Sequence, residues 1–292
     1  MERIAERVVT DWEALMEARA GFDEAWLFRG QPSAWPLVTT LERACALFDV
    51  PPTAMPAVED QMIREFRRRY AGRHRGLTLS DTLFCMALMQ HHGAPTRLLD
   101  FTYSFYVAAY FALEPFGDAP TIWCLNGRWS RARAAAIAGE APIAERERRR
   151  DETSFRALFM NRSRRRFVLP ENPFPLHRRL IIQQGVFVCP ADVSASFLEN
   201  LDPGEAEASD ALVKLRLEFE PGAWRGALTE FSHMNIDRAS LFPGLDGFAQ
   251  SLQLRIPLYQ RIAAAWAEAD ADRPHPGDAA SEQSGSPAPR AG

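Results

Sequence analysis

Two apolar segments separated by a short polar segment constrain the fold of this chain more than any other sequence feature. Residues 83–89 and 103–113 are predominantly apolar, so each predicts a helix without a polar face. Such helices are buried, and Ser80-Asp81 before the first of them is typical of a capped helix start. We therefore expect two buried helices, joined by the polar residues 91–102, at the centre of the fold.

Length and charge limit the classes of protein to which the chain can belong. Its 292 residues are enough for one large domain or two small ones, and its formal net charge of −4 excludes a general nucleic-acid binder. The four cysteines form no Cys-x-x-Cys, so we expect neither disulfides nor a zinc knuckle, and a reducing cytoplasm fits best. Neither a signal peptide nor a membrane-spanning run is expected.

Hydrophobic periodicity predicts a mixed α+β fold, with a small central sheet and many surrounding helices. Thr10 and Glu13 form a capping-box pattern, so residues 1–20 are expected to hold an N-terminal helix. The clearest strand is 212–219, in which apolar and charged residues alternate. Further strands are expected at 25–28, 121–125 and 180–188, and further helices at 41–48, 62–70, 223–234, 238–253 and 256–268.

One domain is expected over residues 21–268, with an arginine-rich insertion and a tail. Residues 128–166 hold twelve Arg against five acidic residues, and we interpret them as an exposed, mostly helical excursion. Residues 269–292 are rich in Pro, Gly, Ser and Ala, which predicts a disordered tail.

Four short segments, in order along the chain, contain the most distinctive sequence motifs of the protein. They are Phe28-Arg29-Gly30, residues 90–102 with the following Ala-x-Tyr-Phe-Ala, Arg179 with 183–187, and residues 241–247. These segments resemble the motifs of the FRG domain family, which is named after the (Phe/Tyr)-Arg-Gly motif. The resemblance covers roughly residues 20–255 and implies little biochemistry, because the family has long counted as functionally uncharacterised.

The same segments supply the side chains expected to form a site. Arg29, followed by Gly30, suits a phosphate or carboxylate, or alternatively it pairs with Asp100 and holds two segments together. Asp100 is the best candidate for an acid, a base or an orienting carboxylate. The expected ligand-binding residues are Arg29, Gly30, Gln31, Thr96, Arg97, Thr102 and Ser104, and the expected catalytic residues are Asp100, His91 and Gln184.

Several of these residues also have a structural interpretation. His91 and His92 end a helix, where an imidazole can act as an acid, contact phosphate or cap the last carbonyls. Thr102 or Ser104 can be the N-cap of the second apolar helix. Gln183 and Gln184 are expected in a strand, so only one of them would face the site. No metal site is expected, because no spacing of a metal-binding motif occurs.

The arrangement is also similar, more distantly, to that of ADP-ribosyltransferases. Arg29 matches their first-strand arginine, and Thr102-Tyr103-Ser104 loosely matches their Ser/Thr-x-Ser element. The sequence departs from the pattern at Gln183-Gln184, where a catalytic Glu is expected, and a neutral Gln cannot stabilise developing positive charge. The resemblance thus implies an anionic ligand or nucleotide, with NAD as a possible substrate, and an effector of the toxin or phage-defence type with transferase-like or glycohydrolase-like activity.

A second function class remains open at this stage. Arg162, Arg164, Arg165 and Arg166 have no acid among them and could contact a nucleic-acid backbone or a protein. In that case the chain is a non-enzymatic binding module. In residues 145–152 both signs of charge alternate, which instead predicts ion pairs within a helix.

Overall fold

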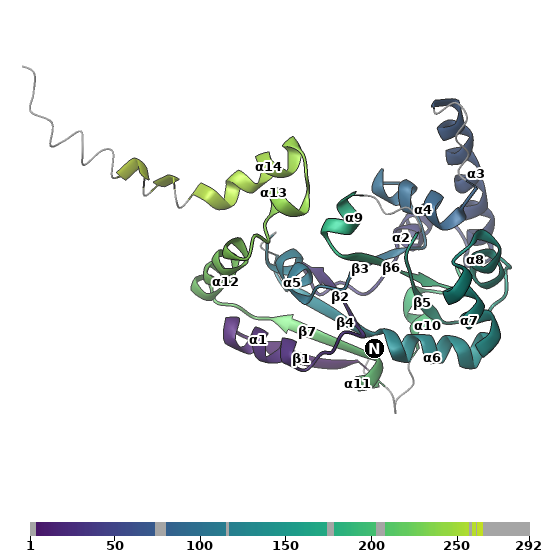
Figure 1. Ribbon diagram of the computed structural model, residues 1–292, viewed down its shortest axis with the longest axis horizontal. Helices are drawn as coiled ribbons and strands as arrows, with labels where there is room; N and C mark the ends of the chain where they lie inside the picture. Colours follow the sequence, from purple (N-terminus) through teal and green to yellow (C-terminus); the bar gives the residue numbers. More distant parts are fainter. Residues whose placement is uncertain are drawn as a thin grey trace, which may run out of the picture.

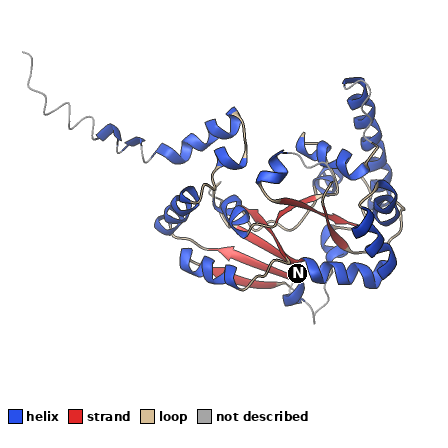
Figure 2. Cartoon of the chain, in the orientation of Figure 1, coloured by secondary structure: helices blue, strands red, loops and turns tan. Residues whose placement is uncertain are grey.

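The computed structural model describes residues 4–73, 80–114, 117–173, 178–202, 208–256, 259–260 and 262–264. One seven-stranded sheet runs through them, in the order β1-β7-β4-β2-β3-β6-β5, with helices around it (Figure 1, Figure 2). Strands β1 and β7 are parallel, and every other neighbouring pair is antiparallel. The expectation of a mixed α+β fold with a central sheet is therefore confirmed.

The strands are short and span most of the chain. They are β1 (Ala5–Val9), β2 (Trp26–Gln31), β3 (Leu99–Thr102), β4 (Thr121–Asn126), β5 (Val168–Glu171), β6 (Gly185–Pro190) and β7 (Leu212–Leu217). The helices of the first half are α1 (Trp12–Ala20), α2 (Thr40–Leu47), the 3-10 turn η1 (Pro52–Ala54), α3 (Met55–Arg73), α4 (Thr82–His91), α5 (Phe105–Leu113) and α6 (Gly127–Ala138). Those of the second half are α7 (Glu140–Arg149), α8 (Glu152–Phe159), α9 (Arg178–Ile182), α10 (Phe197–Leu201), α11 (Ala208–Ala211), α12 (Pro221–His233), α13 (Arg238–Leu241), α14 (Leu245–Ser251) and η2 (Leu252–Arg255).

Helix α5 packs directly onto β2 near the middle of the sheet (Figure 1). All of its residues except Tyr106 and Phe111 are buried, which confirms the expectation for the second apolar helix. The close contact depends on Gly30, because a Cβ at this position would lie 1.8 Å from the carbonyl oxygen of Ala108. Gly30 therefore serves helix packing, and the backbone that it allows to approach is that of α5.

Helix α4 belongs to a second core cluster, which includes residues of β5 and β6 at the other end of the sheet. Its buried residues Leu83 and Met86 pack with Phe155, Phe159 and Phe187 from α8 and β6. The first apolar helix is thus also confirmed as part of a core. Within the described residues, no helix has both the length and the apolar composition that crossing a membrane requires.

The N-terminal segment differs from the expectation of a single helix. Residues 5–9 form β1, which pairs in parallel with β7, and the helix begins only at Trp12. Its N-cap is Asp11 rather than Thr10, because Asp11 Oδ1 accepts from the backbone N–H of Ala14 at 2.8 Å.

The arginine-rich segment 128–166 is mostly helical, as expected, but it is not an exposed excursion. Helices α6, α7 and α8 place Ile143, Phe155 and Phe159 in the core. The side chain of Arg146 is only 4% exposed, because it forms an ion pair with Glu171 at 2.7 Å. This segment is therefore an integral layer of the fold.

Three other expectations also need correction. The strand expected at 180–188 is helix α9 followed by a turn and then β6, so Gln183 and Gln184 lie in the turn. The helix expected at 238–253 is broken at Phe242–Gly244 into α13 and α14, and the polar connection 91–102 contains β3. Most of the helix expected at 256–268, and the whole tail 269–292, lie outside the described residues.

Candidate functional site

Asp100, at the start of β3, is the point at which three separate parts of the chain meet. From β2, Arg29 Nη1 donates to the backbone carbonyl oxygen of Asp100 at 2.8 Å. From α4, Gln90 Nε2 donates to Asp100 Oδ2 at 2.8 Å. From α9, Arg179 is close enough for the Asp100 charge to act on its pKa. We call Arg29, Gln90, Thr96, Asp100 and Arg179 the Asp100 cluster.

Thr96 fixes the orientation of the Gln90 amide. Thr96 Oγ1 donates to Gln90 Oε1, and a carbonyl oxygen can only accept. The amide nitrogen of Gln90 is thereby directed at Asp100. The backbone of Thr96 is itself held by Thr40 of α2, since Thr96 N donates to Thr40 Oγ1 at 2.9 Å and Thr40 Oγ1 donates to Thr96 O at 3.1 Å.

Arg29 is half-buried and is held in place by polar contacts on two sides. Besides the Asp100 carbonyl, it donates from Nε to Gln31 Oε1 at 3.1 Å, and Gln31 Nε2 donates to the carbonyl of Trp35 at 2.8 Å. Burial lowers the pKa of the Arg29 guanidinium, and the charge of Asp100 partly opposes this. Arg29 therefore joins β2 to β3 through the backbone carbonyl of Asp100. It leaves both oxygens of the exposed Asp100 carboxylate for other partners.

The third and fourth sequence segments pack together next to the cluster. The guanidinium of Arg179 lies 4.3 Å from the ring centroid of Phe242, and that of Arg238 lies 4.7 Å from the same centroid. Gln183 Nε2 donates to the carbonyl of Leu241 at 3.0 Å, so α9 and α13 are tied to each other. All four segments identified from the sequence are thus neighbours in space.

Positive charge accumulates around the single carboxylate of the Asp100 cluster. Burial lowers the pKa of Arg179, as it does that of Arg29, and a further arginine adds to each effect, Arg238 for Arg179 and Arg43 for Arg29. Arg238 is paired with Glu114 at 2.7 Å, whereas Arg29 and Arg179 both act on the one exposed carboxylate of Asp100, and a bound anion offsets this excess of positive charge. The electrostatics of the cluster therefore favour a negatively charged ligand.

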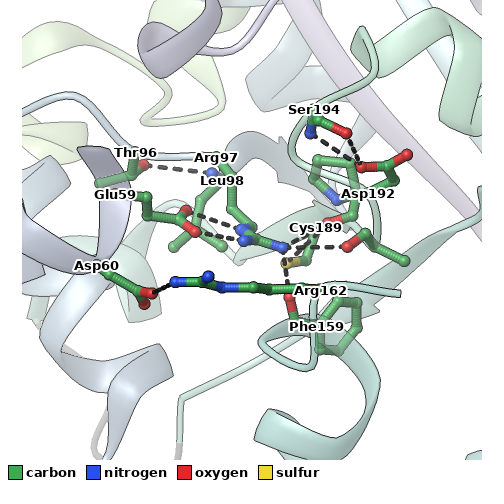
Figure 3. A network of polar contacts seen from close by, with 12 residues as sticks. Glu59, Asp60, Thr96, Arg97, Leu98, Phe159, Arg162, Cys189, Asp192 and Ser194 are labelled. Carbon is green, nitrogen blue, oxygen red and sulfur yellow. Dashed lines mark hydrogen bonds and ion pairs between the residues drawn. The ribbon is translucent and has the colours of Figure 1, made fainter. Parts of the chain in front are cut away.

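Arg97 lies outside this cluster, contrary to expectation, because it forms a buried ion pair with Glu59 (Figure 3). Arg97 Nε donates to Glu59 Oε1 at 2.7 Å and Nη1 donates to the carbonyl of Phe159 at 2.7 Å. Its side chain is 3% exposed and forms part of the wall of a separate cavity of about 190 Å³. Beside it, the exposed Arg162 pairs with Asp60 at 3.1 Å. Arg97 therefore connects α3 to the core.

The residues around the start of α5 have clear structural roles. Ser104 is the N-cap of α5, since its Oγ accepts from the N–H of Val107 at 3.3 Å, as one of the two sequence alternatives had it. Thr102 Oγ1 donates to the carbonyl of Gln183 at 2.7 Å and accepts from the N–H of Ser104 at 2.9 Å. These contacts account for Thr102 and Ser104 without a ligand.

The remaining two candidates, His91 and Gln184, are exposed residues. His91 is the exposed last residue of α4, with its ring centroid 5.1 Å from that of His92, the C-cap. Gln184 is an exposed turn residue with a φ of 47°, and its carbonyl accepts from the N–H of Tyr103 at 2.9 Å. Catalytic roles for His91 and Gln184 stay predictions. Within the part of the chain that the structure describes, no group of three or more His, Cys, Asp or Glu side chains is placed to hold a metal ion.

Two members of the Asp100 cluster were not selected from the sequence as site residues. Gln90 and Arg179 both belong to the motif segments, so the signal for them was present in the resemblance. What the sequence lacked was any indication that Gln90 would turn back toward Asp100, ten residues later, through the bend at residues 92–98.

The fold and the site together define an α+β domain with an arginine-rich polar cluster at one strand of its sheet. A family model described as the FRG domain matches residues 24–118, which supports the resemblance to that family over this part of the chain. No curated protein and no solved structure matches the chain. The matched region contains Arg29, Gln90 and Asp100, whereas Arg179 and Phe242 contact it from outside. The similarity to ADP-ribosyltransferases stays a prediction.

Proposed function

We propose that the Asp100 cluster binds an anionic small molecule, with a nucleotide such as NAD as the first candidate. The observation that carries the proposal is that Arg29 and Arg179, from different segments, both lie near the exposed carboxylate of Asp100. Guanidinium groups bind phosphate and carboxylate through paired hydrogen bonds. Arg29 and Arg179 would hold the anion, and Asp100 would contact a neutral or developing positive part of the same ligand.

The Asp100 carboxylate also determines which chemistry the cluster can support. Loss of nicotinamide from NAD leaves positive charge on the ribose, which an adjacent carboxylate stabilises. Gln184 is neutral and cannot supply this charge, whereas Asp100 is oriented by Gln90 and exposed. We therefore assign the reaction, if NAD is the substrate, to a transferase-like or glycohydrolase-like class with Asp100 as the catalytic carboxylate. An effector role in toxicity or phage defence rests on the family resemblance alone.

A nucleic-acid or protein interface through the arginine-rich segment is less well supported. Arg162 pairs with Asp60 at 3.1 Å, and Arg166 lies 3.6 Å from Glu199. Arg165 also has an internal contact, to the carbonyl of Ala138 at 3.5 Å. The two ion pairs reduce the charge that is available to a phosphate backbone, and the contact of Arg165 occupies one of its donors. The four buried free cysteines fit a cytoplasmic location, where thiols stay reduced.

The binding proposal is tested by thermal stabilisation with NAD, ADP-ribose and inorganic phosphate. A ligand present at 100 times its Kd stabilises the folded state by about 2.7 kcal/mol, which is readily measured as a rise in melting temperature. Arg29→Ala and Arg179→Ala should each abolish this rise. The matched control is Arg64→Ala, because Arg64 is an exposed arginine on α3. Equal stabilisation of all variants, or of none including the wild type, refutes the proposal.

The catalytic part has its own measurement. Wild-type protein incubated with NAD should release nicotinamide, and Asp100→Asn should stop the release while NAD still stabilises the variant. Stabilisation without release by the wild type would leave a binding domain and remove the enzymatic assignment. An Arg29→Ala variant that fails to fold would favour the structural role of Arg29, and Arg179→Ala then decides the question of binding.

A further inference from the structure

A second cavity, of about 360 Å³, lies at the ends of several strands of the sheet, away from the contacts of the Asp100 cluster. It is formed where β2 begins and where β3, β4 and β5 end, and helices α6 and α7 contribute to its walls. Its volume is within the range of roughly 300–1,000 Å³ that is usual for small-molecule sites. The cavity beside Arg97, at about 190 Å³, is below that range. We call the larger one the strand-end cavity.

One side of the strand-end cavity suits a flat ring. Leu27 and Leu169 are buried residues that line it, together with Pro170. Tyr103, which also lines it, is 45% exposed, and its hydroxyl accepts from Asn172 Nδ2 at 2.9 Å. An exposed tyrosine ring in a cavity that apolar side chains also line offers a face on which an aromatic ring can stack. The contact to Tyr103 uses the Asn172 nitrogen and leaves its carbonyl oxygen as an acceptor.

One of the arginines that line the cavity forms no ion pair with a carboxylate of the described residues. Four arginines and three glutamates line it, and three pairs form, namely Arg128–Glu24 at 3.6 Å, Arg131–Glu147 at 3.1 Å and Arg146–Glu171 at 2.7 Å. The guanidinium of Arg150, the fourth arginine, forms no hydrogen bond or ion pair with another described residue, although its charge acts on the buried Glu171 carboxylate. Arg128 and Arg131 also pair with Asp23 at 2.8 Å and with Glu140 at 2.5 Å, so Arg150 is the one arginine of the described lining that forms no ion pair with a carboxylate.

Arg150 is also held in an unfavourable backbone conformation. It is the C-cap of α7 and has a φ of 47° in the left-handed region, where helices usually end in glycine. A side chain in this region costs free energy, and such residues cluster at functional sites. The conformation places an unpaired guanidinium at the cavity.

The buried Arg146 has a spare hydrogen-bond donor in the cavity wall. Its Nε contacts the Glu171 carboxylate, and its Nη1 donates to the carbonyl of Asp151 at 2.9 Å and to Ser154 Oγ at 3.3 Å. Nη2 carries two N–H groups, but it has one acceptor among the described residues, Glu171 Oε2 at 2.7 Å. Buried N–H groups are normally satisfied, so an oxygen of the cavity contents completes this set.

We propose that the strand-end cavity binds a planar aromatic monoanion. Its ring stacks on Tyr103, its anionic group is held by Arg150 and the spare N–H of Arg146, and Asn172 accepts from an amino group on the ring. A single negative charge matches the one guanidinium of the described lining that forms no ion pair with a carboxylate. An aromatic carboxylate and a cyclic nucleoside monophosphate both have this chemistry. The proposal uses none of the residues of the Asp100 cluster and so is independent of the function proposed there.

Calorimetric titration of the full chain tests this inference with two planar probes. The probes are 3-aminobenzoate and adenosine 3′,5′-cyclic monophosphate, and cyclohexanecarboxylate is the control with the same charge and no flat ring. We expect at least one planar probe to bind and the control to bind about tenfold more weakly or not at all. The probe that binds more tightly identifies the source of the ring. Equal binding of the control, or no binding of either probe, overturns the proposal.

Matched variants then locate the bound probe. Arg150→Gln should weaken binding by about tenfold or more, because it removes a charged hydrogen bond. Arg148→Gln should not change it, since Arg148 is also exposed, in the last turn of α7, but does not line the cavity. Arg29→Ala should also leave it unchanged. Binding that is lost in Arg29→Ala and retained in Arg150→Gln would place the probe in the Asp100 cluster, which refutes this inference and leaves the proposed function intact.

Discussion

Gln90 donates from Nε2 to Oδ2 of Asp100 at 2.8 Å, so the last turn of α4 orients the carboxylate at the start of β3. The other end of the same amide accepts from Thr96, which lies between them in the sequence. One motif segment thus contains both the carboxylate and the group that positions it. This arrangement separates two properties that mutation can test, namely the charge near Asp100 and the orientation of its side chain.

Changing Gln90 should distinguish charge from orientation. Gln90→Met removes both hydrogen bonds and should cost about 1 kcal/mol of stability, with a modest loss of anion affinity. Gln90→Glu adds a second carboxylate next to Asp100 and should lower anion affinity by about tenfold beyond the Met variant, because like charge repels the ligand. Thermal stabilisation by inorganic phosphate, measured for both variants, checks this. Identical affinities for the two variants would contradict an anion site here.

The contact between Gly30 and α5 predicts a large loss of stability for a small substitution. Gly30→Ala places a Cβ 1.8 Å from the carbonyl oxygen of Ala108, so strand and helix must separate. We expect a loss of roughly 3 kcal/mol in the free energy of unfolding, measured by urea denaturation. Gly222→Ala in α12 is the matched control, because no atom lies within 4 Å of the added methyl group. It should change stability by less than about 1 kcal/mol.

Local sequence patterns predicted the elements whose burial is visible within one segment. The alternation at 212–217 predicted β7, and the apolar runs predicted α4 and α5, because burial of one face or of all faces is recorded in neighbouring residues. Strand β1 was missed for the opposite reason. Glu6 and Arg7 are exposed, and the segment becomes a strand only by pairing with β7, about two hundred residues later.

The site residues show the same contrast. The contact between two motif segments could be predicted, whereas a contact with a residue outside the motifs could not. The motif order indicated that Arg29 and Asp100 belong together, and the structure places them in contact. Arg97, in the same segment as Asp100, was expected in the site, yet its partner is Glu59, 38 residues earlier on α3. Nothing in the local pattern distinguishes an arginine that binds a ligand from one that binds a distant glutamate. Arg146 and Glu171 repeat this situation in the arginine-rich segment.

The buried pair of Arg97 and Glu59 should be far more sensitive to mutation than its exposed neighbour. Glu59→Gln leaves a buried guanidinium without its counter-charge, which should cost about 3–5 kcal/mol in the free energy of unfolding. Asp60→Asn, one residue later, removes the half-buried partner of the exposed Arg162 and should cost less than about 1 kcal/mol. Urea denaturation of both variants makes the comparison. Equal costs would show that Arg97 is held by its carbonyl acceptors rather than by Glu59.

Asp151, the N-cap of α8, should contribute to stability in a manner that depends on pH. The N–H of Ser154 donates to its Oδ1 at 2.9 Å and Arg149 Nε donates to its Oδ2 at 2.7 Å, and these bonds lower the pKa of Asp151 to about 2. Because this lies below the unfolded value of about 3.9, the contribution is complete above about pH 5 and is lost as the pH falls toward 2. The stability difference between wild type and Asp151→Asn should shrink over the same interval.

A carbon-13 NMR titration of the Asp151 carboxyl group measures this pKa directly and apportions it between the two contacts. Arg149→Gln should raise the pKa of Asp151, since it removes the guanidinium, but the pKa should stay below the usual range because the Ser154 N–H remains. Arg148→Gln, which removes a neighbouring charge that has no contact with Asp151 in the described structure, is the control and should shift the pKa less. A full return to the usual range in Arg149→Gln would show that the ion pair, and not the helix cap, holds the carboxylate in its charged form.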